Sequence, residues 1–264
     1  PSDPPALLAR PAGLWGGWAA QAPADGPGAG LVRRSLITLK ALTYAPTGGI
    51  VAAPTTSLPE QLGGVRNWDY RFCWLRDATL TLLSLMDAGY QEEASAWRDW
   101  LVRAVAGAPE QMQIMYGIAG ERRLPELELP WLPGYEGSAP VRIGNAACRQ
   151  LQLDVYGEVM DALHQARKGG LPGHEPAWAM QRALLDTLEE RWTRPDEGIW
   201  EVRGGRRHFV YSRLMCWVAF ERAMRKQAQR GLPGNTTKWR AVRDADRADE
   251  LFQEFALKLV RRDT

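Results

Sequence analysis

The chain has 264 residues, 45% hydrophobic and 24% charged, which is the composition of a globular protein with one large domain or two small ones. Its formal net charge is +2, and its basic residues are interspersed with acidic ones, so nucleic-acid binding has little support. No apolar run approaches the roughly 18 residues of a membrane span, and no charged-then-apolar signal pattern opens the chain. We therefore expect a soluble, cytoplasmic protein that binds no membrane, with the reservation that its native N-terminus may be missing.

Tryptophan and cysteine stand out in the composition. The 12 tryptophans are an unusually large number, and the flat apolar face of an indole suits a sugar ring. The cysteines are widely spaced and fit no metal-ligand pattern, and only three histidines accompany them. The cysteines are Cys73, Cys148 and Cys216. We predict that they are reduced and buried, and that no disulfide, metal site or cofactor is present.

The first 28 residues are rich in Pro, Gly and Ala and predict an arm or linker that docks through Trp15 and Trp18. Residues 29–264 are then the main domain. Apolar residues at helical spacing predict a first helix over about Leu31–Tyr44. The Pro-interrupted stretch 50–59 predicts an ordered extended loop rather than a central strand.

Six further helices are predicted, and no convincing strand. The first of them, residues 72–88, is apolar on nearly all sides and should be buried all round, whereas the second, 91–105, has a clear polar face and should lie on the surface. An irregular excursion over residues 107–145 is long enough to indicate a functional loop. The remaining helices are expected over about 146–168, 176–193, 211–229 and 236–260.

Two segments carry acidic, basic and aromatic side chains close together. The first, 65–77, threads charges among aromatics instead of placing them on one face. The second is the turn 196–204, in which Gly198 and Gly204 flank Trp200, Glu201 and Arg203. An indole beside a carboxyl raises its pKa, as a general acid requires, and a guanidinium lowers it, so the sequence leaves both outcomes open for Glu201.

The helices follow a repeat of about 70 residues, each unit being an outer amphipathic helix, a loop and an inner apolar helix. This predicts an all-α chain, a partial (α/α) toroid built of about seven helices in hairpins. Because the charged aromatic segments immediately precede inner helices, a toroid gathers them at one end. We therefore predict that Arg76, Asp77 and Glu201 converge on one pocket.

Four stretches, 51–60, 66–77, 142–145 and 197–203, resemble the bacterial branch of glycoside hydrolase family 15, the glucoamylases, glucodextranases and trehalases. The resemblance implies a six-fold (α/α) toroid of twelve helices and inverting hydrolysis of α-glucosidic bonds. It also implies that Glu201 is the general acid. By motif position Trp74, Arg76 and Asp77 resemble the residues that hold the non-reducing glucose. We predict that six further residues of these segments bind substrate as well: Trp68, Tyr70, Arg142, Asn145, Trp200 and Arg203.

Inverting hydrolysis needs a second carboxylate, about 6.5–9.5 Å from the first, to activate water. In the family this base follows the eleventh helix, and residues 208–264 contain no counterpart, so we predict that the general base is absent from this chain and that the C-terminal half of the toroid is its partner. If the chain contains the base after all, Glu136, Glu197 and Asp77 are the next candidates. The alternatives are a non-catalytic carbohydrate-binding remnant and a structural helical scaffold. Trehalose, maltodextrin and isomaltose-type linkages are not distinguished.

Overall fold

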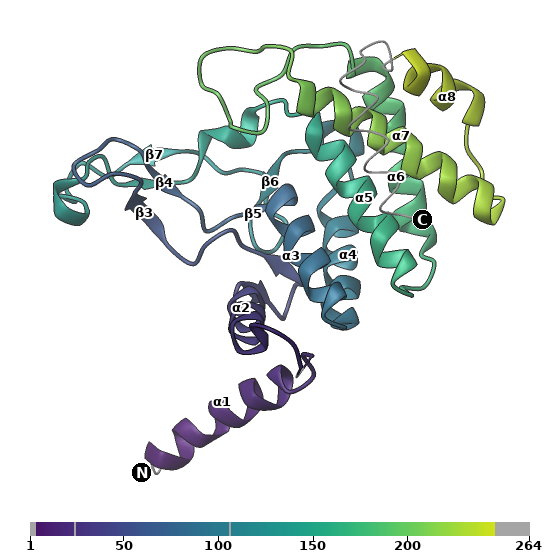
Figure 1. Ribbon diagram of the computed structural model, residues 1–264. Helices are drawn as coiled ribbons and strands as arrows, with labels where there is room; N and C mark the ends of the chain where they lie inside the picture. The colour runs from purple at the N-terminus through teal and green to yellow at the C-terminus, as the bar shows by residue number, and fades with distance from the viewer. Residues whose placement is uncertain (1–3, 24, 106, 246–264) are drawn as a thin grey trace.

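The computed structural model describes residues 4–23, 25–105 and 107–245. Helices dominate this part of the chain (Figure 1). They are α1 (Pro4–Ala19), α2 (Ala29–Ala41), α3 (Leu75–Asp87), α4 (Gln91–Val105), α5 (Asp154–Lys168), α6 (Glu175–Arg191), α7 (Val210–Arg230) and α8 (Thr236–Ala245). The all-α prediction is confirmed, and the seven predicted helices correspond to α2–α8. The last predicted helix extends to 260, and its part beyond Ala245 lies outside the described residues.

Helices α3, α5 and α7 form one layer, and α4, α6 and α8 lie against it (Figure 1). The most extensive helix contact joins α5 to α7, and α3 packs on the other side of α5. Gly157 permits the first of these contacts, since a Cβ atom there would lie 2.1 Å from the carbonyl oxygen of Met215. The sequence order of outer helix, loop and inner helix is therefore the spatial order as well.

Half of the 12 tryptophans are buried in the core. The indoles of Trp97, Trp100, Trp178 and Trp239 are all 1–2% exposed and pack among leucine, valine and methionine side chains. An indole buried in this way contributes a large apolar area to folding and offers no face to a ligand. The high tryptophan content therefore reflects helix packing more than sugar binding.

Two expectations about helix surfaces are wrong. The side chain of Leu80 on α3 is 58% exposed, so this helix is not buried all round. Two charged residues of α4, Glu93 and Arg98, are buried rather than part of a solvated face. Tertiary contacts explain the burial of Glu93, whose Oε1 accepts hydrogen bonds from Lys40 Nζ at 2.7 Å and Trp18 Nε1 at 2.9 Å.

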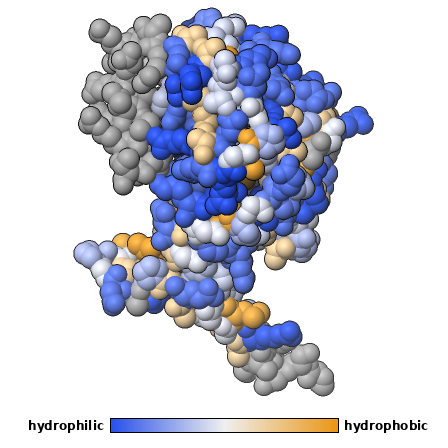
Figure 2. All heavy atoms as spheres, turned by 90° about the vertical axis from the view of Figure 1, so that its right-hand side faces the viewer, coloured by the Kyte–Doolittle hydropathy of each residue, from blue (hydrophilic) through white to orange (hydrophobic). Residues whose placement is uncertain are grey.

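The predicted N-terminal arm contains helix α1, which projects from the body in Figure 1. One of its two indoles docks, because the Trp18 ring stacks on Tyr90 with 4.1 Å between ring centroids. The other, Trp15, remains 39% exposed. The face shown in Figure 2 is largely hydrophilic, with its clearest hydrophobic spots on the projecting helices, where Leu14 and Leu31 are exposed. Within the described ranges, no helix is long and apolar enough to cross a membrane.

Short antiparallel ladders connect the helices, each with two strands. Two of the ladders pack together, because the hydroxyls of Thr56 and Ser57 both donate to the Arg142 carbonyl oxygen. The excursion 107–145 therefore folds back onto the extended loop that precedes α3. The pairs are β1 (Thr43–Tyr44) with β2 (Gly49–Ile50), β3 (Thr56–Pro59) with β4 (Asn67–Asp69), β5 (Cys73–Trp74) with β6 (Met115–Tyr116), and β7 (Leu127–Glu128) with β8 (Arg142–Ile143).

Each cysteine lies near the start of a helix of the α3, α5 and α7 layer. All three thiols are buried, as predicted, and none of them takes part in a disulfide bond. Burial raises the pKa of Cys73 to about 12, so this thiol stays protonated and unreactive at neutral pH.

Candidate active site

The turn 196–204 is anchored to the segment that precedes α5. Backbone hydrogen bonds pair Asp196 with Arg207 and close the loop. The carboxylates of Asp196 and Glu197 then accept hydrogen bonds from the backbone N–H groups of Leu153 and Leu151, at 2.9 and 2.8 Å. The acidic pair that opens the turn is therefore structural, since it fixes where the following residues lie.

Glu201 occupies a strained backbone position within this turn. Its φ is 53°, in the left-handed region that glutamate seldom adopts. The conformation is held from both sides, because its N–H donates to the Gly198 carbonyl oxygen and its own carbonyl accepts from Gln150 Nε2 at 3.2 Å. Strain of this kind costs about 1–3 kcal/mol and recurs at functional sites, where it aims a side chain.

The Glu201 carboxylate is aimed at the start of α3. Its Oε1 accepts a hydrogen bond of 2.7 Å from the indole Nε1 of Trp74 and lies 3.5 Å from Nη2 of Arg76. The side chain remains 25% exposed, so the carboxyl group is both held by protein donors and open to a ligand.

Arg76 connects Glu201 to a buried acidic group. Its Nη1 donates to Gln152 Oε1 at 3.0 Å and lies 3.4 Å from Oδ2 of Asp154, which is fully buried. Desolvation raises the pKa of Asp154, with the charge of Asp196 adding to the effect and that of Arg76 opposing it. Arg76 is thus fixed in one orientation by groups that the sequence reasoning missed.

A second buried carboxyl, Glu158, lies one turn further along α5. It accepts hydrogen bonds from the hydroxyl of Tyr211 and, at 3.3 Å, from that of Thr79. Burial raises the pKa of Glu158, and this effect is larger than the lowering effect of the two hydrogen bonds. Helices α3, α5 and α7 are therefore joined by one polar network beneath Arg76.

The missed residues did leave a sequence signal. Polar residues alternate with leucine over Gln150, Gln152 and Asp154, directly before an inner helix. In an extended backbone this period of two places the three polar side chains on one side. The alternation of polar residues with leucine, more than the residue types alone, therefore indicates a set of polar side chains on one side of this segment.

Asp77 and Tyr70 lie on the same side of the molecule as Arg76. Desolvation raises the pKa of Asp77 and the Arg76 charge opposes this effect, although the residue as a whole is exposed. Burial raises the pKa of Tyr70, as do the charges of Glu60, Glu201 and Asp77. The Tyr70 and Trp74 ring centroids are 5.8 Å apart. Trp74, Arg76 and Glu201 thus converge by direct contact, and Asp77 and Tyr70 adjoin them electrostatically.

Trp68, Arg142 and Arg203 form a second group, which we call the Trp68 cluster. The guanidinium carbons of Arg142 and Arg203 lie 4.6 and 4.0 Å from the centroid of the Trp68 ring. Glu126, which the sequence reasoning missed, joins them, with Oε2 3.0 Å from Arg203 Nη2 and Oε1 3.9 Å from Arg142 Nε. This cluster holds the C-terminal side of the Glu201 turn against the loop excursion.

The remaining two predicted site residues lie differently. Asn145 is buried, and its amide bonds backbone groups, accepting from the Ala147 N–H and donating to the Asp69 carbonyl. Trp200 is 84% exposed, directly before Glu201. Within the described ranges no group of three or more His, Cys, Asp or Glu residues could hold a metal ion.

The sequence of this chain matches the model of a protein family, Glycosyl hydrolases family 15, over residues 26–253. The chain belongs to glycosyl hydrolases family 15. It is 41% identical over 230 residues to a trehalase of Mycolicibacterium smegmatis and 42% identical over 231 residues to one of Mycobacterium tuberculosis, covering 86% of this chain in both cases. A Thermoplasma acidophilum trehalase is 38% identical over 230 residues, covering 87% of this chain.

The family 15 chain spans about a third of the length of these curated relatives, 34% of each mycobacterial protein and 39% of the archaeal one. Among solved structures it resembles a glycosidase, with a TM-score of 0.62 and 18% identity, over 83% of this chain and 55% of that one. This likeness supports the toroid-like fold. The resemblance to family 15 that the motifs suggested is confirmed.

Proposed function

We propose that the protein to which this chain belongs hydrolyses an α-glucosidic bond, and that trehalose is its substrate. The family and the trehalase relatives support this assignment. The observation that carries it is the Glu201 carboxylate, which is accessible, aimed by a strained backbone and held by Trp74 Nε1 at 2.7 Å.

In this proposal Glu201 is the general acid. A glycosidic oxygen needs a proton as its bond to the anomeric carbon breaks, and a carboxyl group aimed at that oxygen supplies it. Trp74 and Arg76 hold the carboxyl group so that only its free oxygen points toward the substrate. The Arg76 charge also stabilises the carboxylate that remains after proton transfer.

The sugar-binding group in this proposal consists of Tyr70, Arg76 and Asp77, and Trp74, which is only 3% exposed, supports it by holding Glu201. Their charged and aromatic side chains suit the hydroxyl edge and the apolar face of a glucose ring. The Trp68 cluster and Trp200 border the same turn and are proposed to contact the leaving-group sugar. Asn145 is proposed to fix the backbone next to the site, because its Oδ1 accepts a hydrogen bond from the Ala147 N–H and its Nδ2 donates one to the Asp69 carbonyl oxygen of β4.

The water-activating base is proposed to come from outside these 264 residues, since the matched part of the chain spans only 34% of each mycobacterial relative. With that base on the opposite face of the sugar, hydrolysis proceeds with inversion. Trehalose carries two α-linked anomeric carbons, so inversion at one of them releases one β-glucose and one α-glucose. Proton NMR during the first minutes of reaction distinguishes this outcome from retention, which releases only α-glucose.

The decisive variant is Glu201→Gln in the full-length protein. It should lower kcat on trehalose by roughly 10²–10⁴-fold, the usual contribution of a positioned acid. The loss should be much smaller on an aryl glucoside with an activated leaving group, because that group departs with little protonation.

Sugar binding by Glu201→Gln, measured by calorimetry, should stay close to that of the wild type. Equal rate losses on the two substrates would contradict the role of Glu201 as an acid. If the wild-type full-length protein binds trehalose without turnover, the carbohydrate-binding alternative is correct instead.

A further inference from the structure

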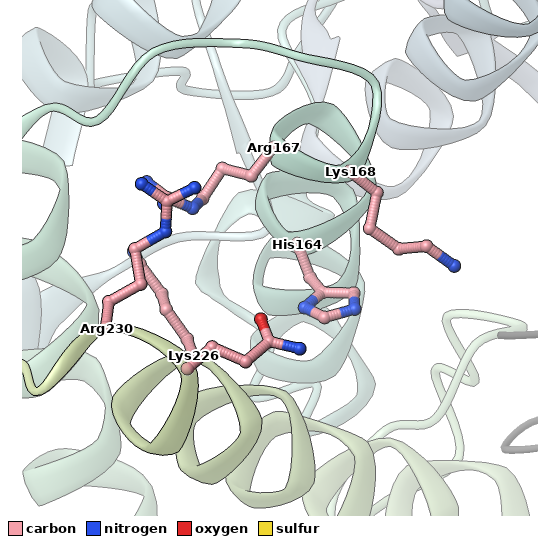
Figure 3. A pocket seen from close by; sticks show the side chains of 6 residues that line it. His164, Arg167, Lys168, Lys226 and Arg230 are labelled. Atoms are coloured by element: carbon pink, nitrogen blue, oxygen red, sulfur yellow. The ribbon is translucent and has the colours of Figure 1, made fainter. Parts of the chain in front are cut away.

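A cavity of about 170 Å³ lies at the C-terminal ends of α5 and α7 (Figure 3). Along α5 it is roughly 20 Å from the candidate active site, the distance that 13 residues of helix span. Within the described part of the chain its lining contains no carboxylate. The lining residues are His164, Arg167, Lys168, Lys226, Gln229 and Arg230.

The basic side chains of this pocket are close enough to act on one another. In Figure 3 the guanidinium groups of Arg167 and Arg230 point toward each other. Burial lowers the pKa of Arg167, and the charge of Arg230 lowers it further. Gathering like charges in this way is unfavourable unless a counter-charge is bound nearby.

Lys226 is the decisive member, because it is buried with neutral partners. It is 6% exposed, its Nζ donates to Gln181 Oε1 at 3.2 Å, and it lies 4.3 Å from the Trp178 ring centroid. Desolvation lowers its pKa to about 7, with the charges of Arg167 and Arg230 also lowering it and that of Glu175 raising it. Among the described residues no carboxylate forms an ion pair with Lys226, and a buried ammonium without such a partner is costly for a fold to keep.

Helix dipoles explain part of this arrangement. Arg167 and Lys168 stand in the last turn of α5, and Arg230 in the last turn of α7, where cations interact favourably with the negative end of a helix. Lys226 lies one turn before the end of α7 and faces into the protein, so the dipole does not account for its position. A role in binding accounts for Arg167, Lys226 and Arg230 together.

We propose that this pocket binds a tetrahedral oxyanion of the phosphate class. Arg167 and Arg230 present planar guanidinium groups that bond two oxygens each, and Lys226 supplies a point charge from the floor of the cavity. The cavity is several times the roughly 30 Å³ that a water molecule occupies, which is enough for a phosphate group. The proposal is independent of the glycosidase function and concerns the opposite end of the same helices.

The first test is calorimetric titration of the full-length protein with sulfate, a tetrahedral dianion that does not titrate near neutral pH. We expect saturable binding at pH 7 with a Kd of about 1 mM or below. The variant Arg167→Gln/Arg230→Gln, at the rim of the cavity, should weaken binding by at least about tenfold.

The matched control is Arg10→Gln/Arg34→Gln, which removes the same charge from α1 and α2. Its affinity should stay within about twofold of the wild type. Absence of saturable sulfate binding by the wild type would overturn the proposal. An equal loss of affinity in the control variant would overturn it as well, because the anion would then be attracted only by the net charge of the protein.

Proton uptake tests the part of Lys226. At pH 8.5 this lysine is mostly neutral in the free protein, and a bound dianion should restore its charge. Sulfate binding should then take up a proton, seen as an enthalpy that depends on the buffer, and Lys226→Met should abolish this uptake. Uptake that persists in a folded Lys226→Met protein would exclude Lys226 as the anion's partner. Other charged and titratable groups surround Lys226. They are Arg98 on α4, His164, Arg167 and Lys168 on α5, His174 and Glu175 at α6, and Arg230 on α7.

Inorganic phosphate and glycerol 3-phosphate, both dianions at pH 8.5, distinguish the source of the ligand. Tighter binding of the free anion assigns the pocket to inorganic phosphate, and tighter binding of the ester assigns it to a phosphorylated small molecule. If sulfate binds and neither phosphate does, the assignment to the phosphate class is wrong.

Discussion

The two ends of helices α5 and α7 carry charge in opposite ways. At the end where α5 begins, Arg76 lies between Asp154 and Glu201, so each charge has a partner of opposite sign. At the end where α5 and α7 finish, Arg167, Lys226 and Arg230 meet among themselves. The helix dipole sets this direction, since acidic residues stand in the first turns of α3 and α5 and basic ones in the last turns of α5 and α7.

Burial gives the two ends different capacities. The groups around Arg76 bond one another, apart from the buried Asp154 Oδ1, which has no hydrogen-bond partner among the described residues. This network holds Glu201 still, as its proposed role as a general acid requires. Among the described residues, the lining of the basic pocket brings no carboxylate to Arg167, Lys226 and Arg230, which favours an incoming anion. The following variants separate the two ends.

Replacement of Arg76 should have the largest effect. In Arg76→Lys the single ammonium cannot bond Gln152, Asp154 and Glu201 together, because it lacks the planar fork. We expect kcat/KM of the full-length protein on trehalose to fall by about 10²-fold or more. Sulfate binding at the basic pocket should not change.

The control for this variant is Arg66→Lys, whose side chain is 74% exposed and pairs with Glu60 on the surface. It should keep wild-type kinetics, since an exposed pair contributes about 0–1 kcal/mol. Similar losses in both variants would show that the site tolerates no basic substitution in this segment, whatever its contacts.

Gly157→Ala should disturb both ends at once, because it separates the helices they share. The added Cβ would lie 2.1 Å from the Met215 carbonyl oxygen, and backbone there cannot move without shifting α7. Overpacking of this kind costs about 1–3 kcal/mol, more than the helix propensity that alanine gains. Urea unfolding followed by circular dichroism should show the loss.

Gly16→Ala on α1 is the matched control, since nothing lies within 4 Å of its added Cβ. It keeps the gain in helix propensity without the clash and should be neutral or slightly stabilising. A stable Gly157→Ala protein would mean that α5 and α7 have room to separate.

Glu126→Gln should have the smallest effect, confined to the candidate active site. It weakens the hold on Arg203 and hence on the Glu201 turn, so kcat/KM should fall by about tenfold or less while sulfate binding persists. The pKa of Glu126 is lowered overall. Burial alone would raise it, but hydrogen bonds from Arg203 and from the Ala146 N–H, together with the Arg142 charge, outweigh that effect.

Because the pKa of Glu126 is lowered, the contribution of its carboxylate to stability depends on pH. Its contribution to stability is full above its ordinary pKa of 4.5 and is lost as the pH falls through the lowered value. The difference in unfolding free energy between wild type and Glu126→Gln should therefore shrink below about pH 4.5. A difference that stays constant from pH 7 to pH 3 would show that Glu126 is not ionically paired in solution.

The sequence by itself determined the helices, their layering and the segments that form the site. Helical periodicity located α2–α8 because each must bury an apolar face, and that requirement is written in the spacing of its own residues. The motif at 66–77 and the turn at 196–204 were recognisable because their charges and aromatics match neither helix nor strand periodicity.

Tertiary structure decided which polar groups meet. Glu126 and Arg203, like Glu93 and Lys40, are far apart in the chain, and their pairing depends on how loops fold back onto helices. Burial likewise separated the core tryptophans from exposed Trp200, although the residue type is the same. The basic pocket forms only where the ends of α5 and α7 come together. Burial of the Lys226 ammonium is costly only because neighbouring helices exclude water from it, and the sequence alone does not show that burial.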